Sequence, residues 1–159
     1  MNTMLLIGFY NGIMKSNIKK IVSSLIKKYN TNDPYALAEH LDIEIIEHDL
    51  GSAYGMYKLV KRNKFIFLNN KLDDDTKRFV LCHELGHAIL HRTSPGFYFK
   101  NHTLMKTSIY EKEANTFAYE LIISDSDLKE SLEFGYTISQ LASYFYVPED
   151  LIKLKLDNM

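Results

Sequence analysis

The chain has 159 residues, enough for one domain, and its 46% hydrophobic and 25% charged residues are typical of a globular protein. Its net charge of −1 gives no reason to expect binding to nucleic acid or to a membrane surface. The single cysteine, Cys82, excludes an internal disulfide and suits a reducing cytoplasm. We therefore expect a cytoplasmic protein without membrane contact.

The first residues, 1–13, contain an apolar stretch that is too short to cross a membrane and lacks the basic start of a signal peptide. We expect residues 1–13 to be an extension that is not needed for function. The remaining residues, 14–159, are then a single domain, with a helical subregion from about residue 125.

The first half of this domain is predicted to contain two helices and three strands. Helical spacing of apolar residues favours a first helix, and Asp33 followed by Pro34 is typical of the start of a second. Runs of strand-forming residues separated by turn residues follow. The helices are expected over residues 16–29 and 34–41, and the strands over 43–48, 54–60 and 64–69.

The second half is predicted to be helical. A break is expected at Ser94-Pro95-Gly96 and another near Val147-Pro148. The helices are expected over residues 74–91, 109–123, 125–133 and 138–156. The order of elements predicts an α+β fold, with a small three-stranded antiparallel sheet packed on a helical core and followed by C-terminal helices.

Residues 83–87 read His-Glu-Leu-Gly-His. Residues four apart on a helix lie about 40° apart around its axis and about 6 Å apart along it, so His83 and His87 project from one face. Two imidazoles in this arrangement can bind one zinc ion, and Glu84 can then take a proton from the zinc-bound water. The motif predicts His83 and His87 as metal ligands and Glu84 as the catalytic residue.

The helix that carries this motif is apolar on nearly every side, which indicates that it is buried. Two histidines and a glutamate are costly to bury unless something satisfies them, and a metal ion would do so. The apolar residues are Phe79, Val80, Leu81, Cys82, Leu85, Ala88, Ile89 and Leu90.

A catalytic zinc ion normally has three protein ligands. His91 is not a candidate, because it lies about 12 Å along the helix axis from His83, and we expect it to form a structural hydrogen bond. Glu111 and Glu113 on the next predicted helix are better candidates, and the spacing does not separate them. Ala114 would let the two helices approach closely, whereas Glu120 is expected to be solvated.

Two segments together carry a resemblance to a known family. Residues 83–91 read HELGHAILH and residues 111–118 read EKEANTFA, a pair that resembles the ImmA/IrrE family of zinc metallopeptidases. Residues 50–57 and 141–148 are similar to the ImmA branch, so the likeness covers about residues 16–156. It implies a zincin-like fold and one zinc ion per chain. It also implies Glu113 as the third ligand, because the second glutamate of E-x-E-A has that role in the family.

The resemblance also implies a substrate. ImmA-type proteins cleave helix-turn-helix repressors of phages and mobile elements, which relieves repression. We therefore expect a cytoplasmic, site-specific endopeptidase with a protein substrate. The strand at 54–60 is expected to hold an extended peptide at its edge. Tyr110, Tyr119 and His102 are candidates for stabilising the oxyanion, and the sequence does not choose among them.

The main alternative is a non-proteolytic, zinc-containing regulatory or DNA-binding module. Residues 139–147 resemble half of a helix-turn-helix. The helix that would enter the DNA, however, begins with Pro148-Glu149-Asp150, and its two negative charges would lie close to the phosphates. Direct nucleic-acid binding is therefore disfavoured. A secreted, toxin-like protease is disfavoured by the lone cysteine and the missing signal peptide.

Overall fold

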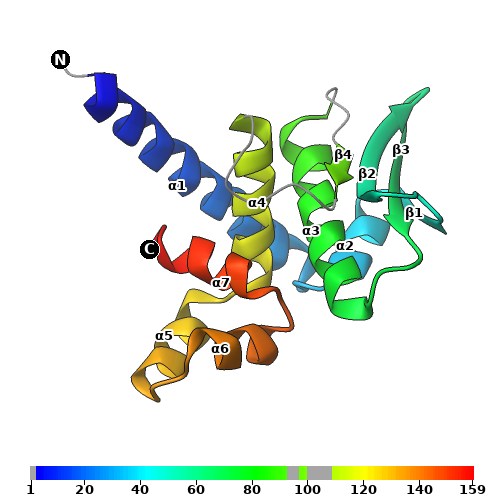
Figure 1. Cartoon of the computed structure of the whole chain (residues 1–159). Helices are drawn as coiled ribbons and strands as arrows, with labels where there is room; N and C mark the ends of the chain where they lie inside the picture. The colour runs from blue at the N-terminus through cyan, green and yellow to red at the C-terminus, as the bar shows by residue number, and fades with distance from the viewer. Residues whose placement is uncertain (1–2, 93–96, 100–108) are drawn as a thin grey trace.

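The computed structural model describes residues 3–92, 97–99 and 109–159. Figure 1 shows the sheet on one side of the molecule, α3 and α4 in the middle, and the last three helices gathered at one end of α4. The helices are α1 (Thr3–Tyr29), α2 (Pro34–His40), α3 (Asp74–Leu90), α4 (Ile109–Ile122), α5 (Asp125–Glu133), α6 (Ile138–Phe145) and α7 (Glu149–Leu156). The strands are β1 (Ile43–His48), β2 (Ala53–Val60), β3 (Asn63–Asn69) and β4 (Phe97–Phe99).

The sheet has the order β1-β3-β2-β4. The strands predicted over residues 54–60 and 64–69 are β2 and β3, which form an antiparallel hairpin. The α+β class is confirmed, but the expectation of a three-stranded antiparallel sheet is wrong in two respects. β1 pairs with β3 in parallel, because the chain reverses between β1 and β2 and again between β2 and β3. The short β4 adds a fourth strand, antiparallel to β2.

Helix α3 begins at Asp74, the residue where the sequence predicted a helix to start. The Asp73 side chain accepts a hydrogen bond from the Thr76 N–H at 2.9 Å, and Asp74 and Asp75 supply negative charge to the first turn. The helix ends at Leu90, where the His91 N–H donates to the His87 carbonyl oxygen at 2.8 Å. Its middle turns, including residues 83–87, are buried as the sequence predicted.

Small residues bring the neighbouring elements close to α3. A Cβ atom at Gly86 would lie 3.0 Å from Ala114 Cα and 3.1 Å from Phe117 Cβ, so α4 packs directly against the Gly86 backbone. On the sheet side, a Cβ atom at Gly55 would collide with the Val80 side chain. Helix α3 is therefore held between β2 and α4 with no room for a larger side chain at either contact.

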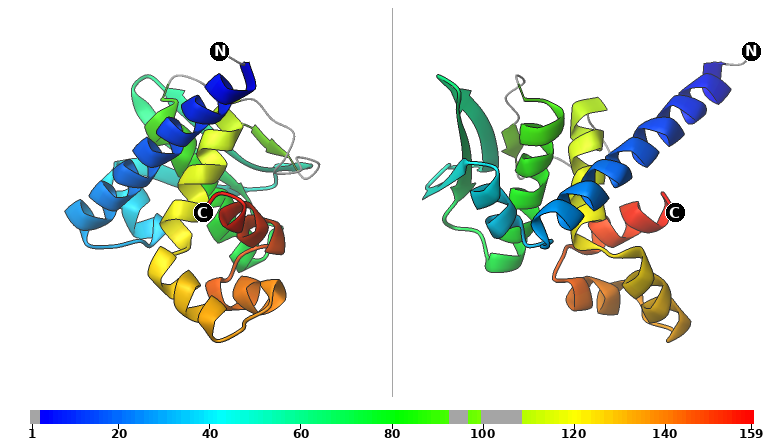
Figure 2. Two further views of the ribbon diagram at one scale, coloured as in Figure 1. Left: turned by 90° about the vertical axis from the view of Figure 1, so that its left-hand side faces the viewer. Right: turned by 180° about the vertical axis from the view of Figure 1, so that it is seen from behind.

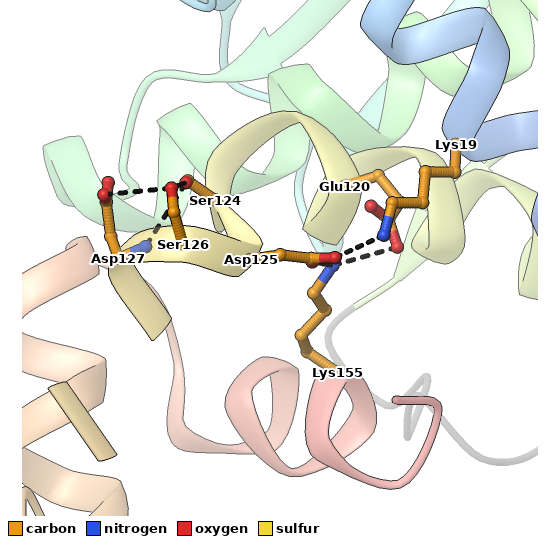
Figure 3. A network of polar contacts seen from close by, with 7 residues as sticks. All are labelled: Lys19, Glu120, Ser124, Asp125, Ser126, Asp127 and Lys155. Atoms are coloured by element: carbon orange, nitrogen blue, oxygen red, sulfur yellow. Dashed lines mark hydrogen bonds and ion pairs between the residues drawn. The ribbon is translucent and has the colours of Figure 1, made fainter. Parts of the chain in front are cut away.

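The C-terminal helices are also anchored on α4. Helix α6 begins with a capping box formed by Thr137 and Gln140 and ends at Tyr146, where the backbone turns left-handed before Pro148 starts α7. The predicted break near residues 147–148 is confirmed. Figure 3 shows how Lys155 of α7 points at Glu120 and Asp125, beside Lys19 of α1.

Helix α1 begins at Thr3, earlier than the residue 16 expected from the apolar spacing, and its first turns extend beyond the rest of the molecule (Figure 2). None of the helices in the described part of the chain is long and apolar enough to cross a membrane. The predicted break at residues 94–96 and the candidate His102 lie outside the described residues.

Candidate metal centre

His83 and His87 lie side by side on the face of α3 that meets α4. Their side chains are 0% and 2% exposed, and their Nε2 atoms are 3.1 Å apart. The helical spacing that the sequence predicted therefore brings the two imidazoles together, with both Nε2 atoms directed into the same small space.

The carboxylate that completes this group belongs to Glu111. Its Oε2 atom lies 3.1 Å from His83 Nε2 and its Oε1 atom lies 3.1 Å from His87 Nε2. The three side chains form the group of possible metal ligands found among the described residues, and we call it the metal cluster.

The structure does not place Glu113, the expected third ligand, in this group. Glu113 Oε2 lies 3.1 Å from His91 Nε2, one helical turn beyond the histidine pair. Residues two apart on a helix point about 200° apart, so only one of the two glutamates can face the pair. Glu111 stands three residues before Ala114, which packs on Gly86, and this places Glu111 on the side of α4 that faces α3.

The pKa shifts of His83 and Glu111 favour the protonation states that a metal ion requires. Burial lowers the pKa of His83, although Glu111 partly opposes this, so the imidazole is neutral. Burial raises the pKa of Glu111, but its contacts with the Nε2 atoms of His83 and His87 outweigh this effect, and the net shift is strongly downward. Neutral imidazoles and an ionised carboxylate are the forms that ligate metals.

The geometry also fits an ion. Ligands of a tetrahedral zinc ion at bond lengths of about 2.0–2.1 Å are separated by about 3.3 Å. The three separations in the metal cluster are each 3.1 Å. The residues present therefore fit a metal ion of this size and coordination.

Asn115 fixes the orientation of His83. Its Oδ1 atom lies 2.8 Å from His83 Nδ1, and Asn115 is 2% exposed. Because the amide oxygen can only accept, Nδ1 carries the hydrogen and Nε2 keeps its lone pair for a metal. Glu111 and Asn115 are four apart on α4, so one face of that helix provides both the carboxylate of the metal cluster and the group that orients His83. The sequence analysis did not single out Asn115.

Glu84 lies against the sheet. It is 0% exposed, and its Oε2 atom accepts a hydrogen bond from the Tyr57 N–H of β2 at 2.7 Å. Its Oε1 atom is buried and has no hydrogen-bond partner among the described residues. Burial raises the pKa of Glu84 well above its ordinary value, partly offset by the Tyr57 hydrogen bond. The backbone thus fixes the Oε2 atom of Glu84, and the Oε1 atom is available to accept a hydrogen bond or a proton.

The other residues considered in the sequence, Tyr110, Tyr119 and Glu120, form contacts outside the metal cluster. Tyr110 packs edge-on against His91 at 4.7 Å between ring centroids. Tyr119 is buried under Lys155, 5.3 Å from its Nζ atom, and is therefore occupied in a different polar cluster. Glu120 is not free in solvent as expected, because its Oε1 atom lies 2.9 Å from the buried Lys155 Nζ.

A buried H-E-x-x-H helix with a glutamate from the following helix defines the class of metallopeptidases to which the fold and site point. The chain matches the peptidase M78 family, described as the IrrE N-terminal-like domain, over residues 38–157. It belongs to this family and is a metallopeptidase.

Two relatives support the assignment. A protein of Bacillus phage phi105 called immunity region protein 2 is 41% identical over 139 residues, which are 87% of this chain and 88% of that protein. The metallopeptidase ImmA of Bacillus subtilis strain 168 is 35% identical over 146 residues, 89% of this chain and 85% of that protein.

Proposed function

We propose that this metallopeptidase is a zinc-dependent, site-specific endopeptidase that cleaves a helix-turn-helix repressor of a phage or mobile element. The observation that carries the proposal is the metal cluster, with Glu84 one residue from His83 and shielded from solvent. In this proposal His83, His87 and Glu111 hold one zinc ion per chain, and Glu84 is the catalytic residue.

The chain's own residues then have defined tasks. A zinc ion, when bound, supplies a water of pKa about 7 and polarises the scissile carbonyl. Glu84 takes the proton of that water and passes it to the leaving amine. The Tyr57 N–H holds Oε2 in place at 2.7 Å, which leaves Oε1 to accept the proton. Asn115 keeps His83 in the tautomer that presents Nε2.

The edge of β2 is the proposed place for the substrate backbone. β4 pairs with β2 only at Ala53, Gly55 and Met56, so the stretch from Tyr57 to Val60 has no strand partner on that side among the described residues. Tyr57 is also the residue whose N–H reaches Glu84. An extended peptide added there would run past the catalytic carboxylate.

The repressor as substrate is supported by the relatives, one named for a phage immunity region and the other a metallopeptidase. The alternative, a non-proteolytic zinc-containing or DNA-binding module, has less support. It gives no reason for a buried carboxyl such as Glu84 beside the metal cluster, and α7 begins with Glu149 and Asp150, which would oppose phosphates. We further propose a cytoplasmic location and that residues 1–13 are dispensable.

The test is to map new protein N-termini in cells that carry the wild-type chain or Glu84→Gln. A repressor fragment is expected with the wild type and should fall by about 10²–10⁴-fold with Glu84→Gln, the usual contribution of a general base. Both proteins should retain equal zinc. Glu130→Gln, on the exposed side of α5, is the matched control and should cleave normally. An unchanged fragment with Glu84→Gln would refute the proposal.

A further inference from the structure

A groove of about 400 Å³ lies where the start of α3 meets α2 and the end of α6, away from the metal cluster. Three tyrosines line it with a large part of their surface in solvent. Tyr35 is 40% exposed, Tyr144 is 52% exposed and Tyr146 is 62% exposed. We call this feature the tyrosine groove. Exposed tyrosines gathered in one hollow are typical of protein interaction sites.

The charges in the groove are predominantly negative. Asp74 and Asp75 line it and are exposed, and neither forms an ion pair among the described residues. Arg78 is the one cation of the lining. It is half-buried, and its Nη1 atom donates to the Phe145 carbonyl oxygen at 3.1 Å. Two carboxylates against one guanidinium leave an excess of negative charge.

The backbone at Tyr146 gives a second, independent observation. Tyr146 has φ 55° and ψ 52°, a left-handed conformation in which glycine or asparagine is favoured over a bulky residue. Its ring is mostly in solvent and contributes little to the core. The stability of the fold therefore does not account for an aromatic side chain at this position, which indicates a role at the surface.

We infer that the tyrosine groove docks lysine or arginine side chains on the folded body of the protein substrate, outside the cleft that holds the scissile peptide. Tyrosine faces attract cations, and unpaired carboxylates complete such a site. The inference rests on the proposed function, because a DNA-binding repressor carries lysine and arginine for phosphate contacts. Asp75 lies eight residues before His83, about 12 Å along the axis of α3, so one substrate can span both places.

The first experiment is independent of proteolysis. The probe is a dye-labelled hexa-arginine peptide, with hexa-glutamate as the negative control, and binding is followed by fluorescence anisotropy. Tyr146→Asn, which suits the left-handed backbone, and Asp74→Asn with Asp75→Asn are each expected to weaken binding at least about fivefold, as loss of a cation–π or charged partner implies. Unfolding temperatures are measured alongside, and Tyr146→Asn should not unfold earlier than the wild type.

The matched control is Asp127→Asn with Glu130→Gln, which removes the same two charges from the exposed side of α5. It should leave arginine-peptide binding unchanged. Equal weakening by the control pair would show that the peptide senses only overall charge, and this would overturn the inference. Undiminished binding to Tyr146→Asn and to the Asp74, Asp75 pair would overturn it as well.

The second experiment uses the repressor identified by N-terminal mapping and a short peptide that spans its cleavage site. Tyr146→Asn should raise KM for the intact repressor at least about fivefold and leave the peptide kinetics unchanged, because docking contributes only to binding of the folded body. Equal KM values for the intact repressor would overturn the docking role while Glu84-dependent cleavage stands. Absence of such cleavage would refute the proposed function and the occupant inferred from it, whereas the arginine-peptide experiment still decides whether the groove binds cations.

Discussion

Helix α4 contributes to two polar clusters, and they differ in whether positive side chains balance the negative ones. Near its start, Glu111 contributes to the metal cluster with His83 and His87. Near its end, Glu120 belongs to the lysine cluster, which we define as Lys19, Glu120, Asp125 and Lys155. Lys155 is 2% exposed, and its Nζ atom lies 2.9 Å from Glu120 and 2.6 Å from Asp125. Lys19 pairs with the same Asp125, so two cations balance two carboxylates (Figure 3).

The metal cluster has no such balance among the described residues. Burial lowers the pKa of His83, the net shift of the Glu111 pKa is strongly downward, and the nearby Glu84 has an oxygen without a hydrogen-bond partner among the described residues. A buried charge is stable only when it is paired. In the lysine cluster, protein groups balance all the charges, so we assign this cluster a role in stability. In the metal cluster, the negative charge would be balanced only by a cation from outside the chain, so we assign this cluster a role in catalysis.

The comparison is tested most directly at the third ligand. Glu111→Gln is expected to lower zinc affinity by more than about 100-fold, because it removes a ligand charge and not only an orienting group. Glu113→Gln, two residues away and beside His91, is the matched control and should bind zinc normally. Competition with a chromophoric chelator measures both. The opposite ranking would restore Glu113 as the ligand.

A smaller effect is expected from the group that orients His83. Asn115→Ala should weaken zinc binding by about 10–100-fold, since the imidazole loses the acceptor that fixes its tautomer. Asn115→Asp should keep or strengthen binding, because a carboxylate is a better acceptor from Nδ1–H. Thr116→Val, the neighbouring change on α4, controls for effects on the helix. Equal zinc affinities for Asn115→Ala and the wild type would remove this role.

The smallest effect concerns the lysine cluster and appears in stability. Burial raises the pKa of Asp125, but hydrogen bonds with Lys155 and Lys19 outweigh it and the net shift is downward. A carboxyl with a lowered pKa in the folded state stabilises the fold above its unfolded value of about 3.8–3.9, and this contribution disappears as the pH falls through the folded value.

Asp125→Asn should therefore cost about 1.5–3 kcal/mol of unfolding free energy at pH 7, the range for a hydrogen bond to a charged group. The difference from the wild type should vanish in acid. Urea unfolding across pH 2–8 measures it, with zinc affinity as the second readout, which should not change. Asp127→Asn, in the same first turn of α5, should have little effect. A loss of stability that is the same at all pH values would exclude the ion pairs as its cause.

Local signals were sufficient for much of the fold. The Asp73 cap, the Asp33-Pro34 start of α2 and the break before Pro148 each depend on one or two residues, and the structure has all three. The parallel pairing of β1 with β3 depends on which edge of the hairpin β1 joins, and strand patterns within the chain do not encode that choice. The start of α1 was misplaced because residues 1–13 were interpreted as an extension, although Leu6, Phe9, Tyr10 and Ile13 have the apolar spacing of a helix.

In the site, too, local sequence predicted some features, whereas others depend on how the helices pack. His83, Glu84 and His87 lie on one helix, so helical geometry alone placed them together. The choice between Glu111 and Glu113 depends on the rotation of α4 relative to α3. A signal for that rotation was present in the sequence, because Glu111, Ala114 and Ala118 form one helical stripe and Asn115 lies four residues after Glu111. The tyrosine groove joins residues from α2, α3 and α6, and only the folded chain reveals it.

The contact at Gly86 has a consequence for metal selectivity. Two of the proposed ligands stand on α3 and the third on α4, and the distance between these helices is fixed where the Gly86 backbone touches Ala114. The width of the gap between the helices therefore determines which ionic radius fits the site. We expect a methyl group at position 86 to widen this gap and to shift the preference of the proposed zinc site toward larger cations, without altering any proposed ligand.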